Sequence, residues 1–390
     1  MYRISRFQQI MKALPRGTFD RVVQTHQADK HSKGFGCWDQ LIAMVYAQMS
    51  GASSLRVLET GFNSQHTQHY HLGATPIKRS TLSDANSKRK TEVFADTAKL
   101  LMSSASRSLR REGEELLYLL DSSSISLKGP GFDAWTSGNS TRNTQGIKLH
   151  LLFAGNEAIP VRHSITAPNV NDIDEGRQLS IEPNAVYVFD KGYCDYNWWY
   201  KINEQKARFV TRFKRNAALS VERALPISDK DAGIVLKDEI VRFANKHPRG
   251  GCKNHYTTPL RRVTVARPDH DQPLLLATND LVSQASVIAR RYKDRWGIEL
   301  FFKWIKQHLK IKSFLGRNEN SVRIQILTAL ITYLLLAIYR KAQNYGGSLW
   351  ILLAEVRATL FQRPAVEAER YRRRRNNMTE FAARQGGLFV

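Results

Sequence analysis

Apolar residues recur at helical spacing through the first part of the chain. They repeat every three to four positions in residues 19–25, 38–49, 55–62 and 93–109. An apolar face repeated on each helical turn is typical of an amphipathic helix. The pattern therefore predicts an all-α N-terminal region over residues 1–110.

A basic segment precedes the last of these helices. It carries Arg79, Ser80 and Thr81, and Lys88 follows about two turns further on. Ser80 or Thr81 is suited to cap a helix whose N-terminal amides, with Arg79 and Lys88, would meet phosphate. A capped surface helix with a solvated basic face explains the same residues equally well.

From residue 115 onward the hydrophobic period changes to two. Short apolar runs occur as LLYLLDSSSISL, GIKLHLLFAG, IPVRHSITAP, AVYVFDKGY and RFVTRF, which predict strands. Residues 171–179 and 195–206 are each long enough for one helix. The order strand, strand, strand, helix, strand, helix, strand indicates a mixed α/β sheet.

A second strand-rich block follows over residues 215–276, with the runs EIVRFAN, LRRVTVAR and PLLLAT. We expect it to form an inserted β subdomain. Residues 286–310 predict one long helix, broken only by Gly297. Residues 324–340 predict a buried core helix rather than a membrane span, because polar residues interrupt a run that is shorter than about 20 residues.

These patterns predict four parts of the chain. They are an N-terminal helical region (1–110), an α/β domain (111–214 and 277–345), a β-strand insertion (215–276), and a C-terminal helical segment with a basic tail (346–390). The tail contains Arg370 and the arginine run 372–375, which we expect to be flexible and to add nonspecific, salt-sensitive affinity for DNA.

The net charge narrows the choice of partner. Lysine and arginine number 59 against 35 aspartates and glutamates, which gives +24, while 42% of the residues are hydrophobic. Such a composition excludes a disordered polycation and indicates a folded, strongly basic protein. Phosphate backbones are the expected partner, and membrane surfaces or acidic proteins are weaker alternatives.

The cysteines point to a reducing compartment. Cys37, Cys194 and Cys252 lie far apart in the sequence, so their spacing indicates neither a disulfide framework nor a zinc motif. The first 17 residues are mixed rather than continuously apolar, so we expect no secretory signal and a cytoplasmic protein without a membrane partner.

Two aspartates stand at the ends of apolar strands. Asp121 closes the run 116–120 and Asp190 closes the run 186–189, which is where open α/β sheets place their sites. Neighbouring carboxylates repel unless a cation lies between them, and oxygen ligands of this kind suit Mg²⁺ or Mn²⁺. Either aspartate alone is better explained as a turn cap.

Four chemically distinct side chains share one face of the predicted long helix. Tyr292, Arg295, Glu299 and Lys306 are spaced by 3, 4 and 7 residues, which aligns them on a helix. The apolar residues Leu300, Phe301, Trp304 and Ile305 lie off this stripe, and we expect them to anchor the helix to a core. An amphipathic surface helix accounts for the Arg295 and Glu299 pair equally well.

The same stretch carries a family resemblance. YKDRWGIELFFKWIK resembles the Tyr-x2-Arg-x3-Glu-x6-Lys signature of DDE transposases from bacterial insertion sequences, a family that includes hairpin-forming, cut-and-paste elements. VFDKGYCDYNWW is similar to that family's second-aspartate motif, LLYLLDSSS to its first-aspartate strand, and TRNTQGIKLHLLF to the strand beside it. The resemblance covers residues 79–340, and it departs where Ser122, Ser123 and Ser124 stand in place of a threonine two residues after the first aspartate.

The resemblance implies a fold and a reaction. It implies an RNase H-like sheet in the α/β domain, with Asp121, Asp190 and Glu299 as catalytic residues and metal ligands for two Mg²⁺ ions, with Mn²⁺ as a substitute. The reaction would be cleavage of DNA at the ends of the element and strand transfer into a target. Tyr292, Arg295 and Lys306 would hold phosphates near the scissile bond.

The resemblance also implies partners. The N-terminal helical region would bind the terminal inverted repeats of an insertion sequence. Synapsis of two DNA ends implies at least a homodimer on double-stranded DNA, associated with the nucleoid of a bacterial cell.

Smaller expectations attach to aromatic and basic residues near the site. Trp296, Trp198 and Trp199 could stack a flipped base, although core packing is the favoured alternative for each. Lys148 lies on a strand next to the proposed site, where a phosphate contact and a solvated strand face are equal alternatives. Two other functions stay open: a Mg²⁺-dependent DNA nuclease without strand transfer, and a non-catalytic DNA-binding remnant or repressor.

Overall fold

The protein is described here from a computed structural model, and the described residues are 4–110, 113–141, 144–245, 253–267, 271–311 and 313–362. The chain forms two compact units, one of residues 1–101 with 307–390 and one of residues 102–306. The basic tail around residues 372–375 lies outside the described residues.

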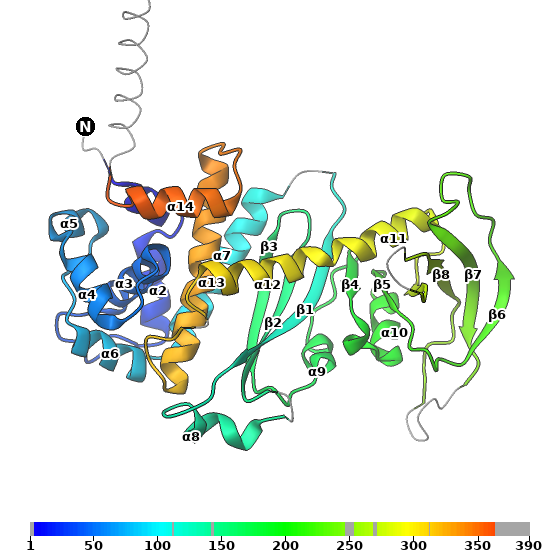
Figure 1. Cartoon of the computed structure of the whole chain (residues 1–390), viewed down its shortest axis with the longest axis horizontal. Coiled ribbons are helices and arrows are strands. Elements are labelled where there is room, and N and C mark those ends of the chain that lie inside the picture. Colours follow the sequence, from blue (N-terminus) through cyan, green and yellow to red (C-terminus); the bar gives the residue numbers. More distant parts are fainter. Residues whose placement is uncertain are drawn as a thin grey trace, which may run out of the picture. The chain divides into compact units, whose positions relative to one another are not determined.

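The first unit is all helical among its described residues. Its helices are α1 (Arg6–Met11), α2 (Arg16–Thr25), α3 (Cys37–Ser50), α4 (Leu55–Asn63), α5 (His69–Leu72), α6 (Arg79–Lys88), most of α7 (Thr91–Leu109), α13 (Glu319–Ala342) and α14 (Leu349–Thr359). Helices α3, α6 and α14 pack against α13 (Figure 1).

Helix α13 is the core of this unit. It is the one helix among the described residues that is long and apolar enough to cross a membrane, and 89% of its most apolar window is buried in the protein. Its polar positions are satisfied internally: the Gln325 side chain donates to Ser313 O at 2.9 Å, and Thr328 and Thr332 donate to carbonyls one turn back. The expectation of a buried core helix is confirmed.

The cap of helix α6 differs from the expectation. The helix begins at Arg79 after Lys78, without a side-chain cap from Ser80 or Thr81. The Arg79 N–H donates instead to Glu59 Oε1 of α4, at 3.0 Å. A neighbouring carboxylate thus replaces the local hydroxyl, and this first-turn amide is already occupied.

The second unit is built on one mixed sheet of nine strands in the order β3-β2-β1-β4-β5-β9-β8-β7-β6. The bounds are β1 Leu117–Ser126, β2 Gly146–Ala154, β3 Ile159–Thr166, β4 Val186–Phe189, β5 Arg208–Arg212, β6 Leu219–Ala224, β7 Val235–Phe243, β8 Leu260–Val265 and β9 Leu274–Thr278. Strand β4 is parallel to β1 and to β5, and the other pairs are antiparallel.

Short helices connect the strands of this sheet, and two longer ones follow it. They are α8 (Asp133–Thr136), α9 (Asp172–Arg177), α10 (Tyr196–Glu204), α11 (Ala285–Asp294) and α12 (Trp296–His308). In Figure 1, α11 and α12 run one after the other across the strands. The predicted order of five strands and two helices from residue 115 is therefore confirmed.

The strands of the 215–276 block do not build a separate sheet. Strand β9 pairs antiparallel with β5, with Val210 opposite Thr278, and β8, β7 and β6 follow outward from it. The expected β insertion thus extends the central sheet, because β9 satisfies the backbone groups at the edge of β5.

The predicted long helix is in fact two helices. Helix α11 ends at Asp294, with Arg295 as its C-cap, and α12 begins at Trp296. Phe301 and Ile305 are buried as expected, but Leu300 is 61% exposed. The expectation that Leu300 anchors this helix was wrong, because the segment buries a narrower face than its apolar content suggests.

A buried ion network holds α11 against the sheet. The Arg291 side chain is 8% exposed and makes two hydrogen bonds to Glu115, of 2.9 and 2.6 Å, and one to Asp280, of 2.8 Å. Arg208 of β5 reaches the same two carboxylates. Hydrogen bonds to Ser283 and Arg291 hold the pKa of Asp280 well below its usual range despite its burial.

Candidate active site

The sheet brings the two aspartates together where the parallel pairing of β1 with β4 ends. The expectation that both stand at strand ends holds for Asp190, which follows β4, but was wrong for Asp121, because the serines after it continue β1 by pairing with β2. In the parallel pair of β1 and β4, Leu120 lies opposite Phe189, so Asp121 and Asp190 are the next residues on neighbouring strands. Both strands are apolar and buried along this pair, which fixes their register. The two carboxylates stand where the polar part of each strand begins.

Asp190 is held by a tight turn. Its carboxylate accepts a hydrogen bond from the Gly192 N–H at 2.5 Å and caps the short helical turn Lys191–Tyr193. A Cβ atom on Gly192 would lie 2.8 Å from Asp190 Oδ1, closer than side chains tolerate. The glycine in the DKGY motif is therefore required by the position of this carboxylate.

Glu299 joins the aspartates through Arg295. One end of the Arg295 guanidinium lies 2.5 Å from Glu299 Oε1 and the other lies 3.7 Å from Asp121 Oδ2. The guanidinium also lies over the Tyr292 ring, 5.7 Å from its centre. Arg295 thus contacts Tyr292, Glu299 and Asp121, even though the helix breaks at Arg295.

Burial and neighbouring carboxylates shift the pKa values of two acidic groups at this site. Burial raises the pKa of Asp121 to about 6, and the nearby charges of Asp190 and Glu299 add to that effect. The Ser122 N–H and the Arg295 guanidinium oppose it. Burial also raises the pKa of Tyr193 well above its usual value, with contributions from the charges of Asp121 and Asp190.

Lys306 closes the site from the far end of α12. Its ammonium donates to the Ser123 hydroxyl at 2.6 Å and to the Ser124 carbonyl at 3.1 Å. Ser123 stands two residues after the first aspartate, where the resemblance noted in the sequence implies a threonine, and it supplies a hydroxyl of the same chemistry. This contact ties Lys306 to the strand that carries Asp121.

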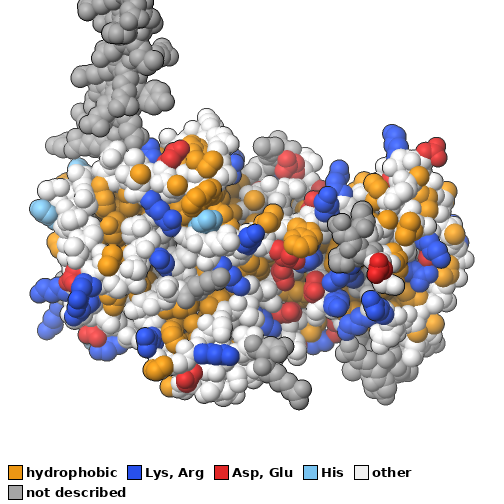
Figure 2. Space-filling view, viewed as in Figure 1, with side chains coloured by type: hydrophobic (Ala, Val, Ile, Leu, Met, Phe, Trp, Pro, Cys, Tyr) orange, Lys and Arg blue, Asp and Glu red, His pale blue; other side chains and the backbone are white. Residues whose placement is uncertain are grey.

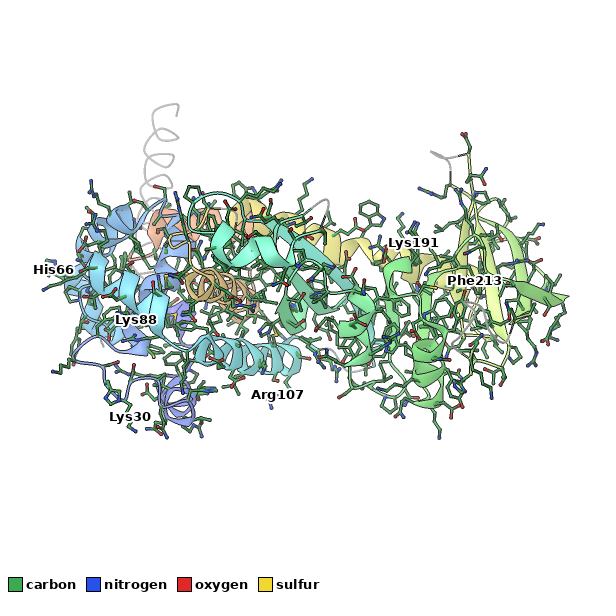
Figure 3. The ribbon with its side chains drawn as sticks, turned by 90° about the horizontal axis from the view of Figure 1, so that it is seen from below. Lys30, His66, Lys88, Arg107, Lys191 and Phe213 are labelled. Atoms are coloured by element: carbon green, nitrogen blue, oxygen red, sulfur yellow. The ribbon has the colours of Figure 1, made fainter. Side chains whose placement is uncertain are left out.

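The remaining predicted residues are placed as follows. Trp296 is 58% exposed on α12, beside Arg295, whereas Trp198 and Trp199 are buried in the core. The Lys148 side chain is 14% exposed and donates to Val170 O and Asp172, so it does not lie on a solvated strand face. Arg79 and Lys88 are exposed on α6 of the helical unit, where Figure 3 labels Lys88.

The donor set matches a divalent cation in type. Three carboxylates supply hard oxygen ligands, which Mg²⁺ and Mn²⁺ prefer. Among the described residues, however, no group of three or more His, Cys, Asp or Glu side chains is arranged to hold a metal. The Arg295 guanidinium takes the position of a cation between Asp121 and Glu299, so a metal ion there requires this side chain to move.

A basic groove opens beside Asp190. It has a volume of about 950 Å³, and its lining carries two carboxylates and five cationic side chains: Asp172, Asp190, Lys191, Arg212, Lys214, Arg215 and Arg267. Figure 2 shows acidic side chains gathered in the middle of this face, with lysines and arginines next to them, and Figure 3 labels Lys191 and Phe213 of the groove. Sequence patterns did not single out these cations, because isolated Lys and Arg residues in turns carry no spacing signal.

Comparison with known proteins assigns the family. The model of the transposase DDE domain matches residues 112–335, and the chain belongs to this family. A second model, a domain of unknown function (DUF4372), matches residues 3–75. The expectation of a DDE transposase of insertion sequences is confirmed.

Two relatives found by sequence agree with this assignment. The chain is 46% identical to a putative transposase, y4zB, of Sinorhizobium fredii, over 66% of this chain and 70% of that protein. It is 28% identical to a probable transposase for insertion sequence element IS5377 of Geobacillus stearothermophilus, over 64% of this chain and 65% of that protein. A cryo-EM structure of a piggyBac transposase synaptic complex with hairpin DNA aligns with 11% identity and a TM-score of 0.46, covering 96% of this chain and 84% of that chain.

The protein is therefore a transposase, an enzyme that binds DNA and transfers its phosphodiester bonds. Enzymes of this family use divalent metal ions. Asp172, which lines the groove with Asp190, was missed by the sequence analysis. In the sequence it is one of several acids in the first turn of a short helix, which is a common pattern of helix starts.

Proposed function

We propose that Asp121, Asp190 and Glu299 are the catalytic carboxylates of this transposase and the ligands of two Mg²⁺ ions on an RNase H-like sheet. The strand order β3-β2-β1-β4-β5, with β1, β4 and β5 parallel, supports that fold. The observation that carries the proposal is the proximity of these carboxylates, which come from positions 69 and 109 residues apart in sequence. Arg295 links Asp121 to Glu299, and the charges of Asp190 and Glu299 both act on Asp121.

The metal supplies charge stabilisation for in-line displacement at a phosphodiester, and Mn²⁺ is a substitute of the same ligand preference. The protein supplies position and countercharge. Arg295, held by Tyr292 and Glu299, neutralises charge that develops on a phosphate at this edge. Lys306, fixed to Ser123, places a second cation beside the first aspartate.

The basic groove extends the DNA contact beyond the carboxylates. Its five cations begin next to Asp190 and fit a phosphate backbone that continues from the scissile bond. Exposed Trp296 and exposed Arg79 and Lys88 provide further contacts for DNA. We assign binding of the terminal inverted repeats to the N-terminal helical region, synapsis to a homodimer, and the reaction to the bacterial cytoplasm at the nucleoid.

Excision tests the proposal directly. Purified protein and Mg²⁺ are incubated with DNA that carries the gene's own flanking ends, beside Asp121→Asn, Asp190→Asn and Glu299→Gln. Glu204→Gln is the matched control, because Glu204 is an exposed glutamate at the end of α10. The wild type and the control should release the segment and join its 3′ ends to a second DNA, whereas the three site variants should bind DNA without cutting.

Other outcomes would point elsewhere. Cutting without joining by the wild type would indicate a nuclease, and binding without cutting would indicate a remnant or repressor. Cleavage retained in any one site variant would remove that residue from the catalytic set.

A further inference from the structure

A fourth carboxylate, Asp172, lies next to residues that adjoin the two proposed catalytic aspartates. It is the first residue of α9, and its side chain is 27% exposed. The Ser122 hydroxyl donates to Asp172 Oδ1 at 2.8 Å. Ser122 directly follows Asp121, and its N–H donates to the Asp121 carboxylate at 2.8 Å. One residue therefore connects the two acids through its side chain and its backbone.

Asp172 also faces the turn that holds Asp190. The position of a Cβ atom on Gly192 would be 3.3 Å from Asp172 Oδ2 and 2.8 Å from Asp190 Oδ1. Both carboxylates therefore lie close to the same point beside Gly192. Asp172 and Asp190 also line the same groove, so the charge of one acts on a cation held by the other.

Lys148 balances the charge of Asp172. Its ammonium, on a side chain that is 14% exposed, lies 3.3 Å from Asp172 Oδ1 and donates to the Val170 carbonyl at 2.7 Å. His150 of the same strand lies 3.6 Å from Asp172, and its other ring nitrogen contacts the Thr166 hydroxyl at 2.8 Å. The lysine is therefore held in place from two directions, next to the acid and away from open solvent.

We propose that Asp172 and Lys148 form a charge-balanced positioning pair for the carboxylate site. Through Ser122 the pair fixes the backbone that presents Asp121. Because the charges of Asp172 and Lys148 cancel, the pair also determines the electrostatic potential at a cation held by Asp121 and Asp190. The inference rests on the proposed function, because it takes Asp121 and Asp190 as the metal-holding residues. Asp172 is a positioning residue here and not itself a ligand.

The test uses the opposite charges of the pair. Binding of Mn²⁺ to the full-length protein without DNA is measured by the paramagnetic resonance signal of free Mn²⁺, for Asp172→Asn, Lys148→Met and the double variant. Asp172→Asn leaves an uncompensated ammonium beside the site and should weaken Mn²⁺ binding about tenfold, the size typical of residues that orient metal ligands. Lys148→Met should not weaken it, and the double variant should return close to the wild type.

Controls separate this effect from a general loss of folding. Glu239→Gln breaks a similar half-buried pair with Arg262, of 2.8 Å, on strands far along the sheet, and it should leave Mn²⁺ binding unchanged. Ser122→Ala removes only the hydroxyl that links the acids and should slow cleavage at saturating Mn²⁺, with rescue by Ser122→Thr. Ser122→Ala serves as the readout if Asp172→Asn does not fold.

Two results would overturn the inference. Equal weakening by Asp172→Asn and Lys148→Met, without recovery in the double variant, would indicate a purely structural pair. Unchanged binding in Asp172→Asn, or unchanged cleavage in Ser122→Ala, would exclude the positioning role. Failure of the proposed function would give a different result, because Glu299→Gln and Asp121→Asn would then also bind Mn²⁺ and cleave DNA as the wild type does.

Discussion

The guanidinium of Arg295 lies 2.5 Å from the carboxylate of Glu299, one helical turn further along the chain. The helix break at Arg295 does not separate them, because Arg295 is the C-cap of α11 and Glu299 lies in the first turn of α12. Arg295 also faces Asp121, so a single cation influences the protonation of an acid that comes from a distant strand.

The decrease of the cleavage rate at low pH should therefore depend on Arg295. Burial raises the pKa of Asp121 to about 6, and Arg295 opposes this shift. In Arg295→Ala the pKa of metal-free Asp121 should rise further. Because the proton then competes more strongly with the metal ion, the cleavage rate at a subsaturating Mg²⁺ concentration should reach its plateau at a pH higher by about one unit. The measurement is the cleavage rate against pH, with exposed Arg290→Ala of α11 as the control. A uniform drop in rate at every pH would contradict the coupling.

The ionised Asp121 carboxylate should lower the free energy of unfolding at neutral pH. Its pKa is higher in the folded protein than the ordinary value of 3.8, so the folded state binds the proton more tightly. The stabilisation from that proton is present at low pH and is lost as the pH rises through about 6. Asp121→Asn should then raise the free energy of unfolding by about 2 to 3 kcal/mol at pH 8 and by little at pH 4. Denaturant titrations at both pH values measure this, and an equal gain at both would contradict it.

The buried network of Arg291 should dominate the stability of the sheet unit. Arg291→Met leaves Glu115 and Asp280 with Arg208 in place of two arginines. Removal of one member of a buried ion pair costs up to about 3 to 5 kcal/mol. Exposed Arg290→Met should change stability by less than about 0.5 kcal/mol. Urea unfolding compares the two variants, and similar midpoints would show that the network contributes little.

The cations of the groove should set part of the salt dependence of DNA binding. Lys214 and Arg215 line the groove next to Asp190. If each meets one phosphate of double-stranded DNA, the double change to alanine should reduce the slope of log affinity against log salt by about 1.8. Lys201→Ala, at an exposed lysine of α10, should leave the slope unchanged. An unchanged slope in the double variant would place the DNA elsewhere.

The exposed basic residues of α6 should affect recognition of the DNA ends rather than chemistry. Arg79→Ala with Lys88→Ala should weaken binding to the element's ends about tenfold at low salt. Joining of precut ends at saturating protein should be nearly unaffected. Equal loss in both assays would move these residues to the catalytic step.

The positions of the carboxylates were predictable because the ends of buried apolar runs are marked in the sequence, even though β1 itself continues past Asp121. Asp121 and Asp190 each follow an apolar run, and parallel pairing brings such residues together. The spacing of Arg295 and Glu299 was equally informative, since i and i+4 residues adjoin even near a helix end. Local pattern and tertiary contact agree at these residues.

Other features depend on partners that a local pattern does not contain. The cap of α6 comes from Glu59 of another helix, so Ser80 and Thr81 gave a misleading signal. Leu300 lies in an apolar stretch but is exposed, because the burial of a face depends on what packs against it. Asp172 acquires its position only when Ser122 and Lys148 arrive from two strands.

The pairing of β5 with β9 has a consequence for synthesis. The ribosome completes β5 at Arg212, but its antiparallel partner ends only at Thr278. Until then the growing chain presents an unpaired strand edge, which is a site for misassembly. Glu299 emerges later still, after both aspartates. A nascent chain that has not reached Thr278 therefore carries the exposed edge without the third proposed carboxylate, and the proposed site that cuts DNA can assemble only after Glu299 has been made.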